Sequence, residues 1–244
     1  MVKTCATMKN KKAFSIKNTV SERMIVMKEI VIVRHGQTLF NLLNRTQGWA
    51  DSPLTEVGRQ QARDMGMALR ASDLWIDLVI SSDRGRAIET GRLILETAGL
   101  DLELQESSDW RELSFGSLEG MPNDENIKRM LEQGGYGSTL DAIENRRQFR
   151  EFITDTVVLV DESGWAESRQ DFEERLLTAL SQTIEKLEEV DGQRALVIAH
   201  GVVMETLLIM LTEGEMPEIE NGRAMILVEE NGRFRVKGVN LSQF

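Results

Sequence analysis

The hydrophobic residues of this chain fall into two patterns. Short runs rich in Val, Ile and Leu predict buried strands at about residues 29–34, 77–81, 102–105 and 195–199. Apolar residues at helical spacing, with Thr55 and Ser168 as caps and Gly99 as a stop, predict helices at about 55–70, 82–98, 168–187 and 202–211. The expected buried stripe of the first of these helices is Val57, Ala62, Met65, Ala68 and Leu69. Strands that alternate with helices predict an α/β fold with three layers, α/β/α, around a mostly parallel sheet.

Two parts of the chain depart from this alternation. From about residue 114 to 168, Pro122, Gly134-Gly135 and Gly137 interrupt short helical pieces, one of which is expected at 141–152. We interpret this segment as a helical cap inserted into a single domain of residues 28–244. Near the end of the chain, apolar runs at 225–228 and 234–239 flank Asn231-Gly232, a pattern that predicts an antiparallel hairpin.

Composition and charge exclude several classes of function. The 244 residues are 41% hydrophobic and carry a net charge of −11, so the surface as a whole repels nucleic acid and anionic membranes. The longest apolar stretch, residues 195–211, contains His200, Gly201 and Glu205, so we expect no membrane span. One cysteine allows no disulfide within the chain, and the scarcity of Cys and His disfavours a zinc site.

The first 28 residues are basic, with a net charge of +6, which leaves −17 for the remainder. We interpret residues 1–27 as a flexible basic leader or an upstream extension. No apolar core of signal-peptide length follows the lysines, so we expect a cytoplasmic protein. Hydrophobic residues of the C-terminal hairpin could serve a homodimer, and the sequence leaves the oligomeric state open.

Both histidines follow predicted strands. His35 comes after the run at 29–34, within Arg34-His35-Gly36-Gln37-Thr38, and His200 comes after the run at 195–199, before Gly201. Ligands bind at the carboxyl edge of open α/β sheets, so we expect both rings at that edge. A neutral imidazole attacks phosphorus when a backbone carbonyl holds the proton on its other nitrogen. Arg34 would clamp the phosphoryl oxygens, and Gly36 would let the backbone approach them.

Three further side chains are expected at the same edge. Arg86 lies in the opening turn of a helix, where free N–H groups also attract anions, whereas Arg84 is expected to be more exposed. His200 also begins a helix, and as a protonated imidazole it would hold phosphoryl oxygens in the transition state. Glu112 would donate a proton to the leaving oxygen and then activate water. Taken singly, Arg86 is also typical of an ordinary exposed arginine, and one glutamate among so many acidic residues is more often a solvated surface group.

Together these segments resemble the histidine phosphatase superfamily, in its phosphoglycerate-mutase-like branch. The matching stretches occur in the family's order and cover nearly the whole chain from Lys28. They are residues 34–38 with Asn41 beyond them, 47–58, 81–87, 111–116, 167–168 and 199–201.

The resemblance implies a role for each candidate residue. His35 is implied as the nucleophile that becomes phosphohistidine, and Glu112 as the acid and base. The implied catalytic residues are His35, Glu112, His200, Arg34 and Arg86. The implied phosphate-binding residues are Arg34, Asn41, Gln47, Gly48, Arg86, His200 and Gly201. No metal or organic cofactor is implied, because the pocket itself supplies the positive charge.

The same resemblance favours a phosphatase over a mutase. Gln37-Thr38 and Glu167-Ser168 are more similar to the phosphatases, and the longer basic and proline-rich cap of the mutases is missing. We therefore expect hydrolysis of a small phosphomonoester. Asn44-Arg45 is similar to the mutases, so a mutase that interconverts 2- and 3-phosphoglycerate with 2,3-bisphosphoglycerate is the alternative. A second alternative is a non-catalytic module that binds a phosphorylated ligand.

The cap should select the substrate. Trp49, Tyr136, Arg146, Arg147 and Trp165 are candidate contacts, although core packing or a solvated helix face accounts for each of them more simply.

Overall fold

A computed structural model describes residues 27–134, 143–214 and 216–244. Its strands are β1 (Lys28–Arg34), β2 (Leu78–Ser82), β3 (Leu104–Ser107), β4 (Arg194–Ala199), β5 (Ala224–Glu230) and β6 (Arg233–Leu241). Its α-helices are α1 (Leu39–Leu42), α2 (Glu56–Ala71), α3 (Gly85–Ala98), α4 (Asn123–Gln133), α5 (Arg146–Val160), α6 (Arg169–Glu189) and α7 (Gly201–Leu211). Two 3-10 helices, η1 (Ser108–Trp110) and η2 (Gly116–Leu118), follow β3. Residues 1–26 of the predicted leader lie outside the described residues.

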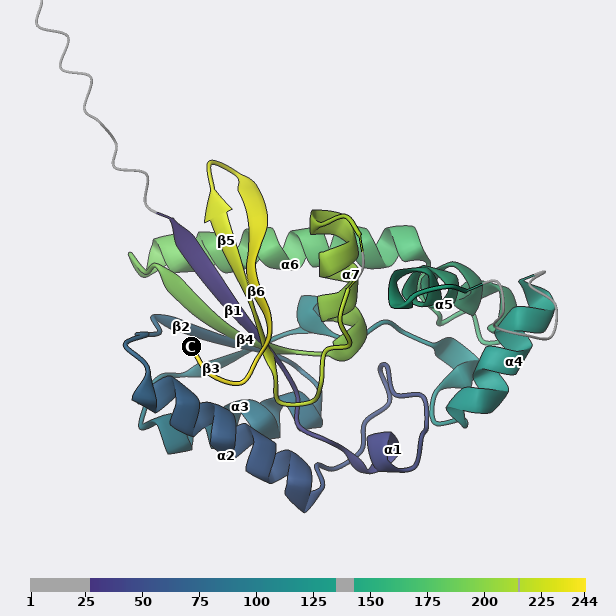
Figure 1. Ribbon diagram of the computed structural model, residues 1–244, viewed down its shortest axis with the longest axis horizontal. Coiled ribbons are helices and arrows are strands. Elements are labelled where there is room, and N and C mark those ends of the chain that lie inside the picture. Colours follow the sequence, from purple (N-terminus) through teal and green to yellow (C-terminus); the bar gives the residue numbers. More distant parts are fainter. Residues whose placement is uncertain (1–26, 135–142, 215) are drawn as a thin grey trace, which may run out of the picture.

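The six strands form one mixed sheet in the order β3-β2-β4-β1-β5-β6. The first four of these strands are parallel, and β5 and β6 run antiparallel as the predicted hairpin. Helices α2 and α3 cover one face of the sheet, and α6 and α7 cover the other (Figure 1). The predicted three-layer α/β fold is therefore confirmed.

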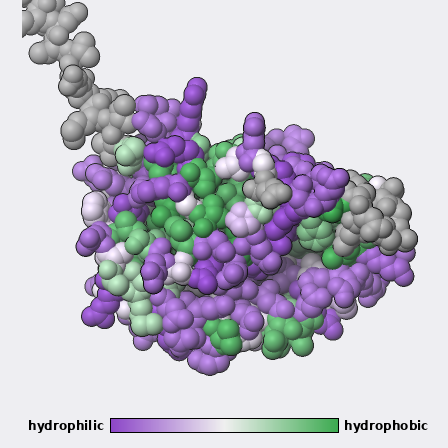
Figure 2. All heavy atoms as spheres, viewed as in Figure 1, coloured by the Kyte–Doolittle hydropathy of each residue, from purple (hydrophilic) through white to green (hydrophobic). Residues whose placement is uncertain are grey.

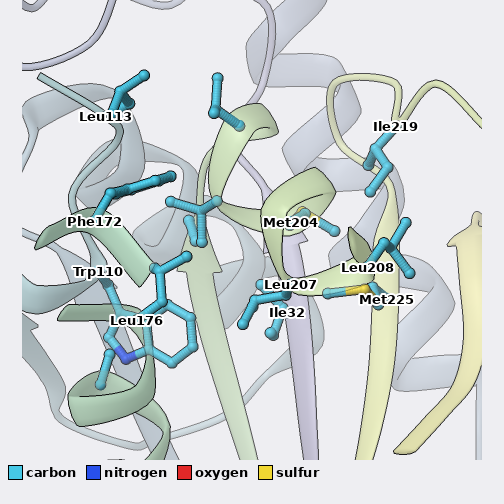
Figure 3. Close-up of a cluster of buried hydrophobic side chains, with 14 of the residues drawn as sticks. Ile32, Trp110, Leu113, Phe172, Leu176, Met204, Leu207, Leu208, Ile219 and Met225 are labelled. Carbon is cyan, nitrogen blue, oxygen red and sulfur yellow. The ribbon is translucent and has the colours of Figure 1, made fainter. Parts of the chain in front are cut away.

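Helix α7 is buried because its sequence is apolar on nearly every side. Its Met204, Leu207 and Leu208 pack in the core with Ile32 of β1 and Met225 of β5 (Figure 3). Burial of this much apolar surface fixes the helix on the sheet, because each fully buried large side chain contributes about 1.5–3 kcal/mol. The N-terminus of α7, which is preceded by His200 as its N-cap, is therefore held at the carboxyl edge of β4.

The predicted capping residues are confirmed. Thr55 accepts the N–H of Gly58 at 3.0 Å at the start of α2, and Ser168 accepts the N–H of Asp171 at 3.1 Å at the start of α6. Gly99 ends α3 with φ of 72°, in the left-handed region that favours glycine.

Some predicted boundaries were wrong. Helix α3 begins at Gly85 rather than at residue 82, because β2 continues to Ser82, and β3 begins at Leu104 because its pairing with β2 starts there. Val57 is exposed rather than part of the buried stripe of α2. Gly58 and Gly66 are buried instead, because this face of the helix meets other backbone segments closely.

Residues 114–168 contain two regular helices rather than only short pieces. The helix expected at 141–152 is α5, which begins later, after the Asn145 cap, and runs on to Val160; residues 141 and 142 lie outside the described residues. Helices α4 and α5 lie together at one end of the molecule, beyond the sheet (Figure 1). Phe152 and Val157 of α5 belong to the same buried cluster as α6 and α7, so this segment shares the core of the rest.

Hydrophilic side chains cover most of the face shown in Figure 2, with a hydrophobic group over β5 and β6. Phe234, Val236 and Val239 of β6 are only partly buried against the core. A homodimer through this hairpin stays a prediction. None of the helices in the described part of the chain is both long and apolar enough to cross a membrane.

Candidate active site

The register between β1 and β4 places the two histidines side by side. Arg34 pairs with Ala199 at the ends of these parallel strands, and the N–H of His35 donates to the carbonyl of Ala199 at 3.0 Å. The residues after the two strands therefore begin at the same edge of the sheet. The rings of His35 and His200 lie edge to face with centroids 5.2 Å apart. The predicted convergence of two imidazoles far apart in the chain is present.

His35 is held in the form that a nucleophile needs. Its Nδ1 lies 2.8 Å from the carbonyl oxygen of Gly36, which only accepts, so Nδ1 carries the proton and Nε2 keeps its lone pair. Burial and then the charges of Arg86 and Arg34 hold the pKa of His35 well below its usual value. The ring is therefore neutral at pH 7.

His200 presents the opposite tautomer. Its Nδ1 accepts from Nη2 of Arg86 at 3.0 Å, so the single proton of the neutral ring lies on Nε2. That Nε2 is buried and has no hydrogen-bond partner among the described residues. Burial, followed by the charge of Arg86, lowers the pKa of His200 well below its usual value. This differs from the expected imidazolium, because the ring can donate to a phosphoryl oxygen while it stays neutral.

Arg86 is almost wholly buried, with 1% of its surface exposed, and its other donors bind the protein. Nη1 donates to the carbonyl of Ala50 at 2.9 Å and to Oδ1 of Asp51 at 3.0 Å, and Nη2 donates to the carbonyl of Gly48 at 2.8 Å. When the side-chain amide of Gln47 is oriented so that both its oxygen and its nitrogen make hydrogen bonds, the oxygen accepts from Nε of Arg86 at 3.2 Å. The structure thus places Arg86 as a support for His200 and the 47–51 loop, and its predicted contact with phosphate stays a prediction.

Arg34 has a donor left for an anion. Nη1 donates to the carbonyl of Ile219 at 2.5 Å, whereas Nε is buried with no hydrogen-bond partner among the described residues. A Cβ on Gly201 would lie 3.1 Å from Cζ of Arg34, so this glycine leaves room for the guanidinium beside the start of α7. The guanidinium of Arg34 thus lies next to a helix N-terminus, and its predicted clamp on phosphate stays a prediction.

Gly36 meets protein backbone rather than open space. A Cβ there would come within 2.2 Å of the carbonyl oxygen of Gly58, and a Cβ on Gly58 would come within 2.1 Å of the carbonyl oxygen of Gln37. The expected role of Gly36 in admitting phosphate was wrong in its physical reason. Its small size instead lets the loop after β1 pack on the start of α2.

Glu112 is buried at the N-terminus of α7. Its Oε2 accepts the N–H of Val202 at 2.9 Å, and its Oε1 accepts the N–H of Val203 at 3.1 Å. Burial raises the pKa of Glu112, and these hydrogen bonds and the charges of Arg150 and Arg86 offset only part of the effect. A carboxyl group with a raised pKa keeps its proton up to a higher pH, as the predicted proton donor requires.

The remaining predicted residues line or shape the site. Asn41 closes the capping box of α1 by accepting from the N–H of Thr38 at 3.1 Å, and it lines the cavity described below. The N–H of Gly48 donates to Glu119 at 2.9 Å. Glu119 also accepts the backbone N–H groups of Trp49, Ala50 and Phe115, and this loop-ordering carboxylate was not among the predicted site residues.

A cavity of about 370 Å³ opens beside Arg34 and Glu112, between the sheet edge and the cap. The cap contributes Arg146 and Arg150 of α5, and both bind Glu205 of α7. Arg150 and Glu205 were not among the predicted site residues. A charge at residue 205, within an otherwise apolar helix, was the signal that could have found them.

The other predicted cap contacts have different positions. Trp49 donates from Nε1 to the carbonyl of Glu112 at 3.0 Å, and its ring meets that of the exposed Trp165. Arg147 donates to carbonyl groups at the end of α7, including that of Thr212 at 2.7 Å. Tyr136 lies outside the described residues. No group of three His, Cys, Asp or Glu side chains within the described ranges could hold a metal ion.

Comparisons with known proteins agree with this geometry. Residues 30–242 match the family model of the histidine phosphatase superfamily (branch 1). A protein from Salmonella paratyphi A named probable phosphoglycerate mutase GpmB is 35% identical over 182 residues, 75% of this chain and 74% of that one. The protein of the same name from Escherichia coli K12 is 36% identical over 182 residues, again 75% of this chain and 74% of that one.

Solved structures show the same fold. The phosphoglycerate mutase from Bacillus anthracis is 30% identical, with a TM-score of 0.81 over 89% of this chain and 95% of that one. YhfR from Bacillus stearothermophilus is 28% identical, with a TM-score of 0.67 over 87% of this chain and 96% of that one. The chain belongs to the histidine phosphatase superfamily, whose members are phosphatases and mutases that act on small phosphorylated substrates.

Proposed function

We propose that the protein hydrolyses small phosphomonoesters through a phosphohistidine on His35. One observation carries the proposal: the carbonyl of Gly36 fixes the proton of His35 on Nδ1, which leaves a nucleophilic Nε2 on a ring whose centroid lies 5.2 Å from that of His200, the ring with the unpaired donor Nε2. A phosphate group between the two rings would meet one nitrogen that attacks and one N–H that donates.

The reaction has two steps. Nε2 of His35 attacks phosphorus, the bond from phosphorus to the ester oxygen breaks, and Glu112 gives its proton to that oxygen. Glu112, now a carboxylate, takes a proton from water while the water oxygen attacks the phosphohistidine, which releases inorganic phosphate and restores both side chains. Arg34 and the Nε2–H of His200 stabilise the phosphoryl oxygens. The proposed reaction uses no metal or organic cofactor.

Trapping the intermediate tests the proposal. The full chain is mixed with p-nitrophenyl phosphate and quenched in alkali, in which phosphohistidine survives. We expect a burst of nitrophenol, an acid-labile phosphate on His35, and continuous phosphate release. His35→Ala should fold normally, by circular dichroism, and lose both the label and the turnover. Phosphate release at the wild-type rate by this variant contradicts the mechanism, and a wild type that binds phosphate without any release favours the non-catalytic module.

The names of the relatives favour a second candidate, a phosphoglycerate mutase. Both reactions share the phosphohistidine, so only the acceptor distinguishes them. A mutase converts 3-phosphoglycerate to 2-phosphoglycerate when 2,3-bisphosphoglycerate is present, and a hydrolase releases phosphate from a panel of monoesters without it. We expect phosphate release to exceed isomerisation under both conditions.

A further inference from the structure

We infer that the organic part of the substrate lies against the cap side of the cavity and carries no second anionic group, because Glu205 neutralises the arginines there. The inference rests on the proposed function and deepens it. It concerns the part of the cavity beyond Arg34 and Glu112, where the group attached to phosphate must lie.

Part of the cavity wall on the cap side is apolar. The side chains that form it come from α4, α5, α7 and the loop after Glu112; they are Phe115, Ile127, Met130, Phe149, Ile153 and Val202. Apolar walls of this kind hold organic groups by burying their surface. A ring or alkyl chain attached to phosphate fits this wall.

The charges around the same part of the cavity cancel. Besides Arg34 and Glu112, the charged residues that line the cavity are three arginines, Arg45, Arg146 and Arg150, and three carboxylates, Asp124, Glu205 and Glu218. A second anionic group on the substrate would therefore meet no net positive charge in this region.

Glu205 is the carboxylate that controls this balance. Only 1% of its side chain is exposed, and it is the only charged residue of α7. Oε1 accepts from Nε and Nη2 of Arg146 at 2.8 and 2.6 Å, and Oε2 accepts from Nε of Arg150 at 2.6 Å. The N–H groups of Arg146 and Arg150 that could bind a carboxylate of the substrate thus bind Glu205 instead.

Burial makes this neutralisation strong, whereas an exposed carboxylate has little effect. Burial alone would raise the pKa of Glu205, but Arg150 and Arg146 lower it, so the side chain is a carboxylate at pH 7. Glu218 also approaches Arg146, with Nη1 to Oε2 at 3.4 Å, but 65% of its side chain is exposed. Solvent screens the charge of Glu218, so Glu205→Gln and Glu218→Gln form a matched pair of variants.

A pair of phosphonates tests the inference without turnover. Phenylphosphonate and 4-carboxyphenylphosphonate differ by one carboxylate, and their dissociation constants on the full chain are measured by titration calorimetry at pH 7.5. We expect the wild type to bind the carboxylated compound no more tightly than phenylphosphonate. Glu205→Gln should shift the ratio of the two constants at least about tenfold towards the carboxylated compound, and Glu218→Gln less than about twofold.

Each result decides the inference. Binding of the carboxylated compound about tenfold more tightly by the wild type overturns it, even if Glu205→Gln fails to fold. A folded Glu205→Gln with the wild-type ratio also overturns it. A chain that binds both phosphonates in the expected ratio but hydrolyses no monoester contradicts the proposed function alone. Active hydrolysis with the opposite ratio contradicts this inference alone, and failure to bind phenylphosphonate contradicts both.

Discussion

Arg86 determines which nitrogen of His200 carries the proton. Nη2 of Arg86 lies 3.0 Å from Nδ1 of His200, and arginine only donates, so Nδ1 must accept. The two catalytic rings are thus prepared in opposite tautomers by different partners: a carbonyl orients His35, and a guanidinium orients His200.

Replacing Arg86 should impair catalysis through His200. Arg86→Met removes the donor to Nδ1, so we expect kcat/KM for a monoester to fall about tenfold to a few hundredfold, the effect of one charge-assisted hydrogen bond. The ¹⁵N shifts of the His200 ring should show loss of the single Nε2–H tautomer. Arg84→Met is the control, because Arg84 binds Asp83 and the carbonyl of Trp49 and makes no hydrogen bond to His200. An Arg86 variant with the wild-type tautomer and rate would contradict this role.

Glu112→Gln should affect substrates according to their leaving groups. An amide cannot donate a catalytic proton, so we expect an alkyl phosphate to lose about 10²–10⁴-fold in kcat/KM. Nitrophenolate leaves without a proton, so p-nitrophenyl phosphate should lose much less. Equal losses on both esters would mean that Glu112 acts only by holding the N-terminus of α7.

The pH dependence of kcat/KM should follow the shifted pKa values of the same two groups. His35 must be neutral to attack, and its lowered pKa moves the acid limb below pH 6.5. Glu112 must be protonated to donate, and its raised pKa moves the alkaline limb above pH 4.5. A bell-shaped profile for an alkyl phosphate is expected, and Glu112→Gln should remove its alkaline limb. An alkaline limb that persists in this variant belongs to another group.

The histidines should also make folding stability depend on pH. The pKa values of both lie below 6.5 in the folded chain, so the unfolded chain binds more protons as the pH falls below 6.5, and stability falls with it. Each histidine contributes a slope of about 1.4 kcal/mol per pH unit between its folded pKa and about 6.5. The raised pKa of Glu112 acts in the opposite direction above about pH 4.5, because the folded chain then holds the extra proton.

A variant isolates the histidine contribution. Between pH 6.5 and 5.5, His35→Asn should remove about 1 kcal/mol of the pH-dependent loss of unfolding free energy measured by urea denaturation, because the unfolded histidine is only half protonated at pH 6.5. The chain has only two histidines, so replacing His200 as well should remove this component entirely. A slope that is the same in the wild type and both variants would show that neither ring is neutral in the folded chain.

The sequence predicted the parts of the site that depend on strand ends. His35 and His200 could be placed because apolar runs mark β1 and β4, and parallel neighbours bring their carboxyl ends together whatever the rest of the fold does. Glu112 and Arg34 were found through the same edge and through the family resemblance.

The contacts that depend on three-dimensional packing could not be predicted. Nothing in the spacing of Arg86 indicates that its donors would bind the 47–51 loop and His200, because those partners lie 35 or more residues away. The Glu205 pairs join α7 to the cap, whose position relative to the sheet no local pattern specifies. Val57 was misplaced because the first turn of α2 packs on the loop after β1 through Gly58, which leaves Val57 exposed.

Gly36→Ala should destabilise the protein at the site itself. The new Cβ would lie 2.2 Å from the carbonyl oxygen of Gly58, a backbone atom that cannot rotate away, so the loop after β1 must separate from α2. Overpacking of this kind costs about 1–3 kcal/mol of unfolding free energy, measured by urea denaturation. The carbonyl that fixes the proton of His35 belongs to this residue, so kcat/KM should also fall. Gly85→Ala is the control, because its Cβ would meet a side-chain carboxylate, that of Asp51 at 2.9 Å, and no backbone atom, and we expect stability within about 0.5 kcal/mol of wild type. If Gly36→Ala were as stable and active as Gly85→Ala, the close backbone contact would not be what holds the nucleophile in place.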